Sequence, residues 1–285
     1  MSRRQDSLDG DVAVEAIHFA DLRMPAGYVL RRGGAPASRL LNGLRAGADA
    51  IEAPCLAFVI RHPDGVILVD SGLHPDAHTN LGSDFGWPMR VLFKSLRPVG
   101  PAFDKQLLEL GIEPESVGKV VMTHLHVDHT SALRLLPNAE FVCTPEEWKA
   151  AQRPLAAMNG YVASHLPAEG RVRLLDLASA GVPYGPLTRT HDLLGDGRVR
   201  LVSTPGHTPG HLSVLVSTSR QGELLLVGDA AYSLRNVDED LLPMLTADDA
   251  ASRRSMAELR ALARGAGAPT LVPSHDPDAW RVLIR

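Results

Sequence analysis

Short apolar runs separated by turn residues recur along the chain and predict β-strands. The stretch "CLAFVIRHPDGVILVDSG" (55–72) predicts two strands joined at Pro63-Asp64-Gly65, because proline presets a turn and glycine tolerates a positive φ. Further strands are predicted for "KVVMT" (119–123), "AEFVC" (139–143), "RVRLVST" (198–204), "HLSVLVS" (211–217), "ELLLVGD" (223–229) and "TLVPSHD" (270–276).

Amphipathic segments predict helices between these strands, at residues 103–112, 144–152 and 246–264. Thr144 would cap the second helix and Glu147 would complete a capping box, while Thr246 would cap the third. Residues 73–100 show no clear period and predict a long loop or a broken helix. Hairpins therefore mix with strand–helix alternation, which favours an α+β fold with two packed sheets flanked by helices.

Composition narrows the class of protein without deciding it. The chain has 285 residues, of which 45% are hydrophobic and 22% charged, with a net charge of -4. These values predict an ordinary globular domain at 13–285 after a flexible segment at 1–12, and they favour neither nucleic acid nor a membrane as partner. No apolar run is long enough to span a bilayer, and no secretory signal is evident. The two cysteines, Cys55 and Cys143, make no disulfide framework, so we expect them to be buried in a cytoplasmic protein.

Side chains that can bind a metal gather at or just beyond the ends of predicted strands. The segment "HLHVDH" (124–129) carries four of them, and three later strand ends carry one each. The set is His124, His126, Asp128, His129, His207, Asp229 and His275. Imidazole and carboxylate suit Zn, Mn, Fe or Co. Seven groups are too many for one tetrahedral ion, and they fit two ions about 3.5–4 Å apart.

The motifs "THLHVDHTS", "STPGHTPGHLS", "VGDAAY" and "SHD" resemble those of the metallo-β-lactamase superfamily, and "VDSG" resembles its early Asp motif. This resemblance runs from about residue 55 to residue 275 and implies an αββα sandwich with a dinuclear site on one edge. It implies that His124, His126 and His207 hold the first metal. It places Asp128, His129 and His275 on the second metal, Asp229 as the bridge, and Asp70 as a residue that orients ligands.

One residue favours a particular branch of this superfamily. Tyr232 follows Asp229 by three positions, as a tyrosine does in N-acyl-homoserine lactonases and in the related 4-pyridoxolactonase. Asp229 and His129 differ from the pattern of the best-known zinc β-lactamases, and the chain after His275 is too short for the helical region of glyoxalase II. His211 has no place in the metal set, and we expect it to act as a hydrogen-bonding support.

The resemblance therefore implies a lactonase that opens N-acyl-homoserine lactones, a carboxylic ester hydrolase of the quorum-quenching type. A hydroxide bridging two divalent ions would attack the lactone carbon. Tyr232 would stabilise the oxyanion and Asp128 would carry a proton to the leaving alkoxide. Zinc is the expected metal, with Fe, Mn or Co as alternatives. Family resemblance also suggests a homodimer.

The substrate pocket and the exact substrate are predicted less directly. The apolar segment "GSDFGWPMRVLF" is expected to line an acyl pocket, or else to pack in the core or a dimer interface, through Phe85, Trp87, Met89, Leu92 and Phe93. The same chemistry could serve another lactone, such as 4-pyridoxolactone, an ester or a phosphotriester. A third hypothesis is a non-catalytic metal-binding protein that keeps the fold, against which the intact ligand set argues.

Overall fold

The structure is a computed structural model that describes residues 10–31 and 50–284. Residues 1–9, which belong to the segment expected to be flexible, lie outside the described residues. Within the described part, the strands form a seven-stranded sheet of order β4-β1-β2-β3-β5-β6-β7 and a six-stranded sheet of order β13-β12-β11-β10-β9-β8. Both sheets mix parallel and antiparallel pairs.

The first sheet comprises β1 (Ala13–Pro25), β2 (Ala50–His62), β3 (Gly65–Val69), β4 (Leu96–Pro98), β5 (Lys119–Val121), β6 (Glu140–Cys143) and β7 (Val172–Leu174). The second comprises β8 (Val182–Tyr184), β9 (Leu187–Asp192), β10 (Val199–Ser203), β11 (Leu212–Thr218), β12 (Gly222–Gly228) and β13 (Thr270–Pro273). The helices are α1 (Ala26–Val29), α3 (Pro75–Thr79), α4 (Leu81–Leu92), α5 (Phe103–Glu109), α6 (Val127–Thr130), α7 (Pro145–Ala151), α8 (Leu177–Ala180), α9 (Leu234–Glu239) and α10 (Asp249–Ala263).

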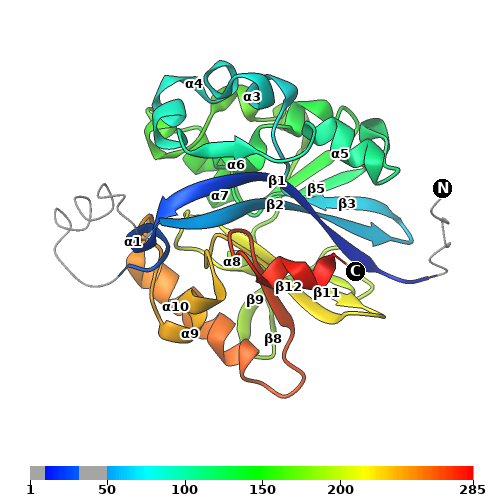
Figure 1. Ribbon diagram of the computed structural model, residues 1–285. Coiled ribbons are helices and arrows are strands. Elements are labelled where there is room, and N and C mark those ends of the chain that lie inside the picture. The colour runs from blue at the N-terminus through cyan, green and yellow to red at the C-terminus, as the bar shows by residue number, and fades with distance from the viewer. Residues whose placement is uncertain (1–9, 32–49, 285) are drawn as a thin grey trace.

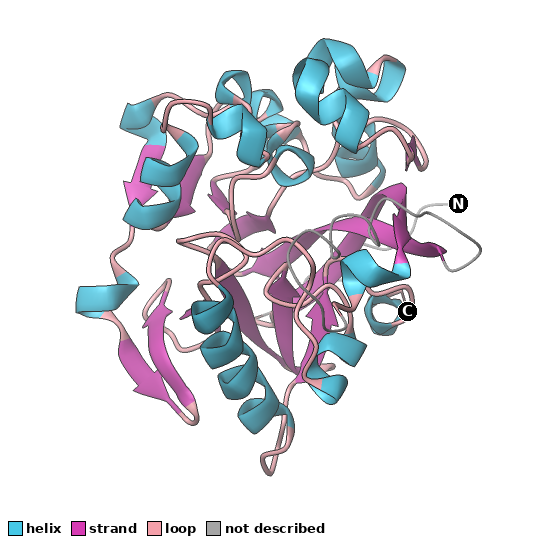
Figure 2. Ribbon diagram, turned by 90° about the vertical axis from the view of Figure 1, so that its left-hand side faces the viewer, coloured by secondary structure: helices cyan, strands magenta, loops and turns pink. Residues whose placement is uncertain are grey.

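The two sheets pack face to face between helices, which confirms the predicted αββα sandwich. Figure 1 shows α3, α4 and α5 above the first sheet and α9 and α10 at the lower left, where they pack on the second sheet, and Figure 2 shows the layers from the side. Alternate residues of β2 divide between two cores: Ala57 and Val59 face the helices, while Phe58 faces the second sheet. Because both faces of such a strand are buried, its sequence is a continuous apolar run.

Several strands were not predicted from the sequence. The longest, β1, pairs antiparallel with β2 along almost its whole length, with a register shift between His18 and Ala20. Its half-exposed positions interrupt the apolar pattern, so tertiary pairing rather than local composition defines it. The strands β4, β7 and β8 are three residues long and leave too short a pattern to detect.

The helix starts require two corrections. Thr144 caps α7 by accepting the Glu147 N–H at 3.3 Å, but the Glu147 side chain does not complete a capping box and reaches two loops instead. The cap of α10 is Asp248, whose Oδ1 accepts from Ala250 N at 2.8 Å, and not Thr246. The predicted start of α10 lies two residues too early because threonine and aspartate can both cap a helix.

Residues 73–100 form a broken helical segment, one of the two alternatives expected. Gly86, at φ 73°, interrupts α4 and lets it change direction. Asp84 fastens this helix to the chain beyond the histidine-rich segment: it accepts from Ser131 Oγ at 2.5 Å and pairs with His165 at 3.1 Å and Arg134 at 2.6 Å. Burial would raise the pKa of Asp84, but these partners outweigh it and lower the pKa to about 2.

Among the described residues, no helix is both long enough and apolar enough to cross a membrane.

Candidate metal centre

The ends of strands from both sheets meet at one edge of the sandwich. Asp70 follows β3, and the segment from His124 to His129 follows β5. In the second sheet, His207 follows β10, Asp229 follows β12 and His275 follows β13. Each strand is anchored by its ladder, so its end holds a side chain at a fixed place. All seven predicted ligands are brought together by this arrangement.

The distances between these side chains are those of groups that can share ions. Asp229 lies at the middle: its Oδ2 is 3.4 Å from His207 Nε2 and 3.9 Å from His124 Nε2, and its Oδ1 is 3.3 Å from His275 Nε2 and 3.5 Å from His129 Nε2. The two oxygens of one carboxylate thus face two different sets of histidines. This is the position of a bridging ligand.

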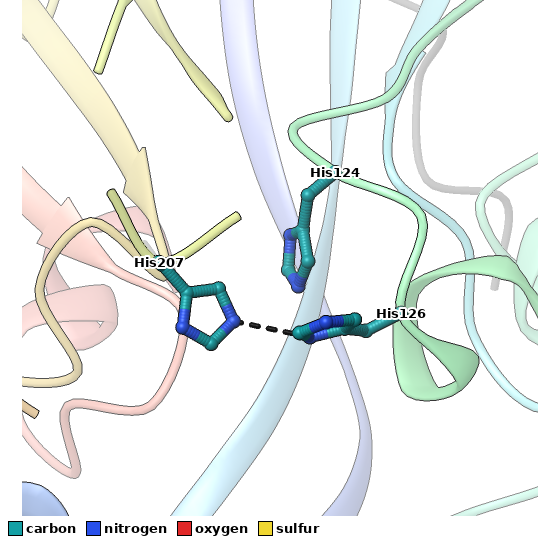
Figure 3. Close-up of side chains that lie close together, drawn as sticks. All are labelled: His124, His126 and His207. Carbon is teal, nitrogen blue, oxygen red and sulfur yellow. Dashed lines mark hydrogen bonds between the residues drawn. The ribbon is translucent and has the colours of Figure 1, made fainter. Parts of the chain in front are cut away.

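The side chains form three groups of possible ligands, and within each group the ligand atoms lie within 4.8 Å of one another. They are His124, His126 and His207; His124, His129 and Asp229; and Asp128, His129 and His275. Figure 3 shows the first group, with the three rings turned toward a common point and His207 Nε2 3.1 Å from His126 Nδ1. The first and third groups share no residue.

Hydrogen bonds behind the first-sheet histidines decide which ring nitrogen faces the centre. Asp70 accepts from Thr123 N and Thr123 Oγ1, both at 2.7 Å, and from His129 Nδ1 at 2.8 Å. Since the Thr123 hydroxyl donates to Asp70, it accepts from His124 Nδ1 at 3.0 Å. Both histidines therefore carry a proton on Nδ1 and turn Nε2, the nitrogen that can bind an ion, toward the centre.

The second-sheet histidines are held in the same way by backbone carbonyls. His207 Nδ1 donates to Leu245 O at 3.0 Å, and His275 Nδ1 donates to Pro54 O at 2.8 Å. Each turns its Nε2 toward Asp229. Four histidines thus have one nitrogen fixed by the protein and the other free for an ion.

A metal fits this donor set because buried acceptors lack protein partners. Among the described residues, His124 Nε2 and Asp229 Oδ1 are buried without a hydrogen-bond partner. A buried polar atom left unpaired costs about 1–3 kcal/mol, and a cation at this point would satisfy both. Neutral imidazoles and carboxylates are the ligands of Zn and related ions.

Charge in the cluster depends on burial and on the carboxylates. Desolvation lowers the pKa of His124, His126 and His207, so these rings are neutral at neutral pH, as metal ligands must be. Burial also opposes the charge on His129, but Asp70 and then the other nearby carboxylates outweigh it and raise its pKa to about 9. The carboxylates around His129 therefore favour a positive charge on this side of the centre.

His211 has the supporting role expected of it. Its Nε2 accepts the Asp229 N–H at 2.9 Å and its Nδ1 lies 2.9 Å from Thr204 Oγ1. Burial lowers its pKa to about 3. His211 is therefore a neutral ring that fixes the backbone carrying Asp229, and neither of its nitrogens is left for an ion.

A cavity of about 980 Å³ opens above the centre. His126, Asp128, His207, Asp229 and His275 are part of its lining. Much of the remaining wall is apolar, with Leu22, Met24, Leu92, Phe93 and Met244 among its residues.

Tyr232 also lines the cavity, with its ring 5.7 Å from that of His207 and 5.3 Å from that of His275. Burial raises the pKa of its phenol, and Asp229 and Asp128 raise it further. The hydroxyl therefore stays protonated at neutral pH and can donate a hydrogen bond.

Three of the five residues predicted for the pocket do not line this cavity. Phe85 and Met89 are buried in the core, and Trp87 is 72% exposed at the surface. The break at Gly86 and the helical spacing direct residues 85 and 89 inward. Leu92 and Phe93, the other two residues expected to line the pocket, do lie on the cavity wall.

Sequence reasoning missed Tyr161, which packs its ring edge-on to His126 with ring centroids 5.1 Å apart. The turn before it allows this contact: Gly160 has φ 92°, and a Cβ there would lie 2.9 Å from His126 Cδ2. The Asn159-Gly160 pair is a turn signal that could have marked the segment, but nothing local indicates that it packs on a ligand.

The sequence profile of the metallo-beta-lactamase superfamily matches residues 50–275. The chain belongs to this superfamily, as its fold and its cluster of histidines and aspartates indicate. It is 37% identical over 235 residues to the N-acyl homoserine lactonase AttM of Azorhizobium caulinodans, and 36% identical over 241 residues to that of Agrobacterium fabrum. Each alignment covers 82% of this chain and 86% of the relative.

Solved structures agree on the fold. An N-acyl homoserine lactone hydrolase with the product N-hexanoyl-L-homoserine bound at its catalytic metal centre superposes with a TM-score of 0.71, at 20% identity and over 95% of both chains. The dizinc quorum-quenching lactonase AidC gives a TM-score of 0.61, at 15% identity, over 95% of this chain and 92% of that one.

Proposed function

We propose that this protein is a metal-dependent lactonase that hydrolyses the ring ester of N-acyl-homoserine lactones. One observation carries the proposal: seven donor side chains converge beneath an apolar cavity with the Tyr232 phenol in its wall. The relatives named as N-acyl homoserine lactonases support the choice of substrate, since they match most of this chain at more than a third identity.

The centre is proposed to hold two divalent ions, with zinc as the expected metal. His124, His126 and His207 would hold one ion, Asp128, His129 and His275 the other, and Asp229 would contact both, in accord with the separate groups described above. Bound ions at this place would polarise the ester carbonyl and lower the pKa of a water molecule from 15.7 to about 7. Asp70 would keep His129 and, through Thr123, His124 oriented.

The side chains of the protein then supply orientation and proton transfer. Tyr232 donates a hydrogen bond to the carbonyl oxygen as negative charge develops there, and its contribution is largest in the transition state. Asp128, which also lines the cavity, would take the proton of the hydroxyl group added to the carbonyl carbon. It would then pass this proton to the alkoxide oxygen that leaves when the C–O bond of the ring breaks. The apolar walls accommodate an acyl chain and keep bulk water from the reacting carbonyl.

The direct test incubates metal-loaded protein with N-acyl-homoserine lactones of several chain lengths and measures the ring-opened acyl-homoserine by mass spectrometry. Ring opening of at least one of them supports the proposal, and no product from any of them refutes the substrate. A parallel panel of other lactones, including 4-pyridoxolactone, with p-nitrophenyl esters and a phosphotriester, decides the alternative substrates. Measured metal content below one ion per chain would instead revive the non-catalytic alternative.

Location and assembly are part of the same proposal. Cys55 and Cys143 are free and buried, which supports the cytoplasm as a reducing compartment. A homodimer is proposed from the family resemblance, and light scattering coupled to size-exclusion chromatography tests it.

A further inference from the structure

One buried acid lies outside the metal cluster yet contacts both loops that carry its ligands. Glu147, in the first turn of α7, is fully buried. Its Oε1 accepts the N–H of Leu125 at 3.0 Å, and its Oε2 accepts the N–H of Gly210 at 3.1 Å. One carboxylate thus joins the histidine-rich loop of the first sheet to the loop of the second.

The two backbone groups that Glu147 contacts lie close to metal-binding histidines in the sequence. Leu125 lies between His124 and His126, and Gly210 lies three residues after His207. These three histidines form the first ligand group, which takes two members from one loop and one from the other. Among the described residues, no strand ladder joins the two loops. One backbone hydrogen bond, from Leu212 N to Thr123 O at 2.9 Å, links them at their strand ends, and Glu147 links them again beside the ligands.

The first turn of α7 also contacts the loop of Gly210 through Thr144 and through close packing. Thr144 Oγ1 donates to Gly210 O at 2.8 Å. A Cβ on Gly210 would lie 2.1 Å from Thr144 Oγ1 and 2.3 Å from Glu147 N, so only glycine permits this approach. Gly210 has no left-handed φ, and its need for glycine is therefore one of space. The loop is built to sit on the first turn of α7.

If only packing mattered at position 147, a buried carboxylate would be unfavourable. Removing a charged acid from water costs several kcal/mol unless hydrogen bonds compensate, and a glutamine of the same shape would avoid that cost. The side chain faces two N–H donors, however, and only a carboxylate offers an acceptor to each. The chemistry of the site thus matches the need to hold two backbones at once.

We propose that Glu147 is a positioning residue for the metal centre, which sets the spacing between the loop of His124 and His126 and the loop of His207. This inference rests on the proposed function only in that the centre binds divalent ions. Glu147 touches neither ion nor substrate in this scheme, and it acts through Leu125 and Gly210.

The test is Glu147→Gln, which keeps size and shape but turns an amide group toward one of the two N–H donors. Metal-free wild-type and variant proteins are titrated with Co²⁺ against a chromophoric chelator, and the visible absorption of the bound ion is recorded. We expect the affinity of the first ion to fall about 10–100-fold, with a changed Co²⁺ spectrum because the ligand geometry is altered.

The matched control is Gln106→Glu, on α5, a helix with no residue on the cavity. Its amide donates to Val99 O at 2.9 Å and Pro101 O at 2.7 Å, so the exchange also removes buried hydrogen bonds. This control should lose thermal stability while keeping the wild-type Co²⁺ affinity and spectrum. If Glu147→Gln does not fold, Thr144→Val replaces it as the test. This change removes the bond to Gly210 O together with the cap on the Glu147 N–H, and it should weaken Co²⁺ binding about fivefold.

Two results overturn the inference. The first is wild-type Co²⁺ affinity and spectrum in Glu147→Gln, or in Thr144→Val in its place. The second is an equal loss of Co²⁺ affinity in the Gln106→Glu control at an equal loss of stability. Neither result touches the proposed function, which fails separately if wild-type protein binds no ion or binds ions without opening lactones.

Discussion

Replacing Asp70 by asparagine would test how the metal centre is held from behind. Asp70 is 1% exposed and accepts hydrogen bonds from Thr123 N, Thr123 Oγ1 and His129 Nδ1. Its φ of 61° is left-handed, a conformation that asparagine also adopts readily. Asp70→Asn therefore leaves the backbone unstrained and changes only the acceptor.

The expected loss follows from the count of donors. The amide keeps one acceptor oxygen for three donors, so at best the Thr123 N–H is left facing an NH₂ group, which costs about 1–3 kcal/mol. The bond to His129 also loses its charged acceptor, which is worth about 1 kcal/mol more. We expect the free energy of unfolding of the metal-free protein to fall by roughly 2–4 kcal/mol. His129 becomes a weaker ligand, so affinity for the second ion should fall about 10–100-fold, or about 1.4–2.8 kcal/mol.

The assay combines urea unfolding of the metal-free protein with Zn²⁺ titration against a chelator. Asp76→Asn is the control, since Asp76 is 61% exposed and its pair with Arg134 belongs to the surface class worth about 0–1 kcal/mol. It should leave Zn²⁺ binding unchanged. Wild-type affinity for both ions in Asp70→Asn would refute the account of ligand orientation given above.

Three further predictions concern the centre and the fold. Asp229→Ala should lower the metal content measured by mass spectrometry and abolish hydrolysis, because it removes the bridging ligand; full metal content would contradict that role. Tyr232→Phe should leave metal content unchanged and reduce turnover of lactones about 10²–10³-fold, as loss of one oxyanion donor does; wild-type turnover would exclude Tyr232 from the reaction. Asp84 has a folded pKa of about 2, below that of an unfolded Asp near 3.9, so its contribution of about 2 kcal/mol is present above pH 4 and is lost as pH falls toward 2. Asp84→Asn should be less stable than wild type at pH 7 by urea unfolding, with a difference that shrinks toward pH 2; a constant difference would contradict this linkage.

Local pattern predicted the parts of the fold whose two faces are buried. Strands such as β11 and β12 are buried over most of their length and are mainly apolar there, and turn residues lie near their ends. Local pattern did not predict β1, because its half-exposed positions interrupt the apolar pattern. Its partner β2 also follows only after residues 32–49 in the chain. Local pattern also misplaced Phe85, Trp87 and Met89, three of the five predicted pocket residues, because the break at Gly86 decides which side chains of α4 turn inward.

By itself, the sequence determined the donor types and their order: histidines and aspartates at the ends of apolar runs, where a strand can hold them. Whether those ends meet is decided only by the tertiary structure, since His126 and His207 are 81 residues apart in the chain and 3.1 Å apart in space. Tertiary structure also decided which nitrogen each ring presents, through Asp70, Leu245 O and Pro54 O. It placed Glu147, a capping residue by its sequence, between two ligand loops. Hydrogen bonds between distant segments leave no local pattern, so these features became visible only in the folded chain.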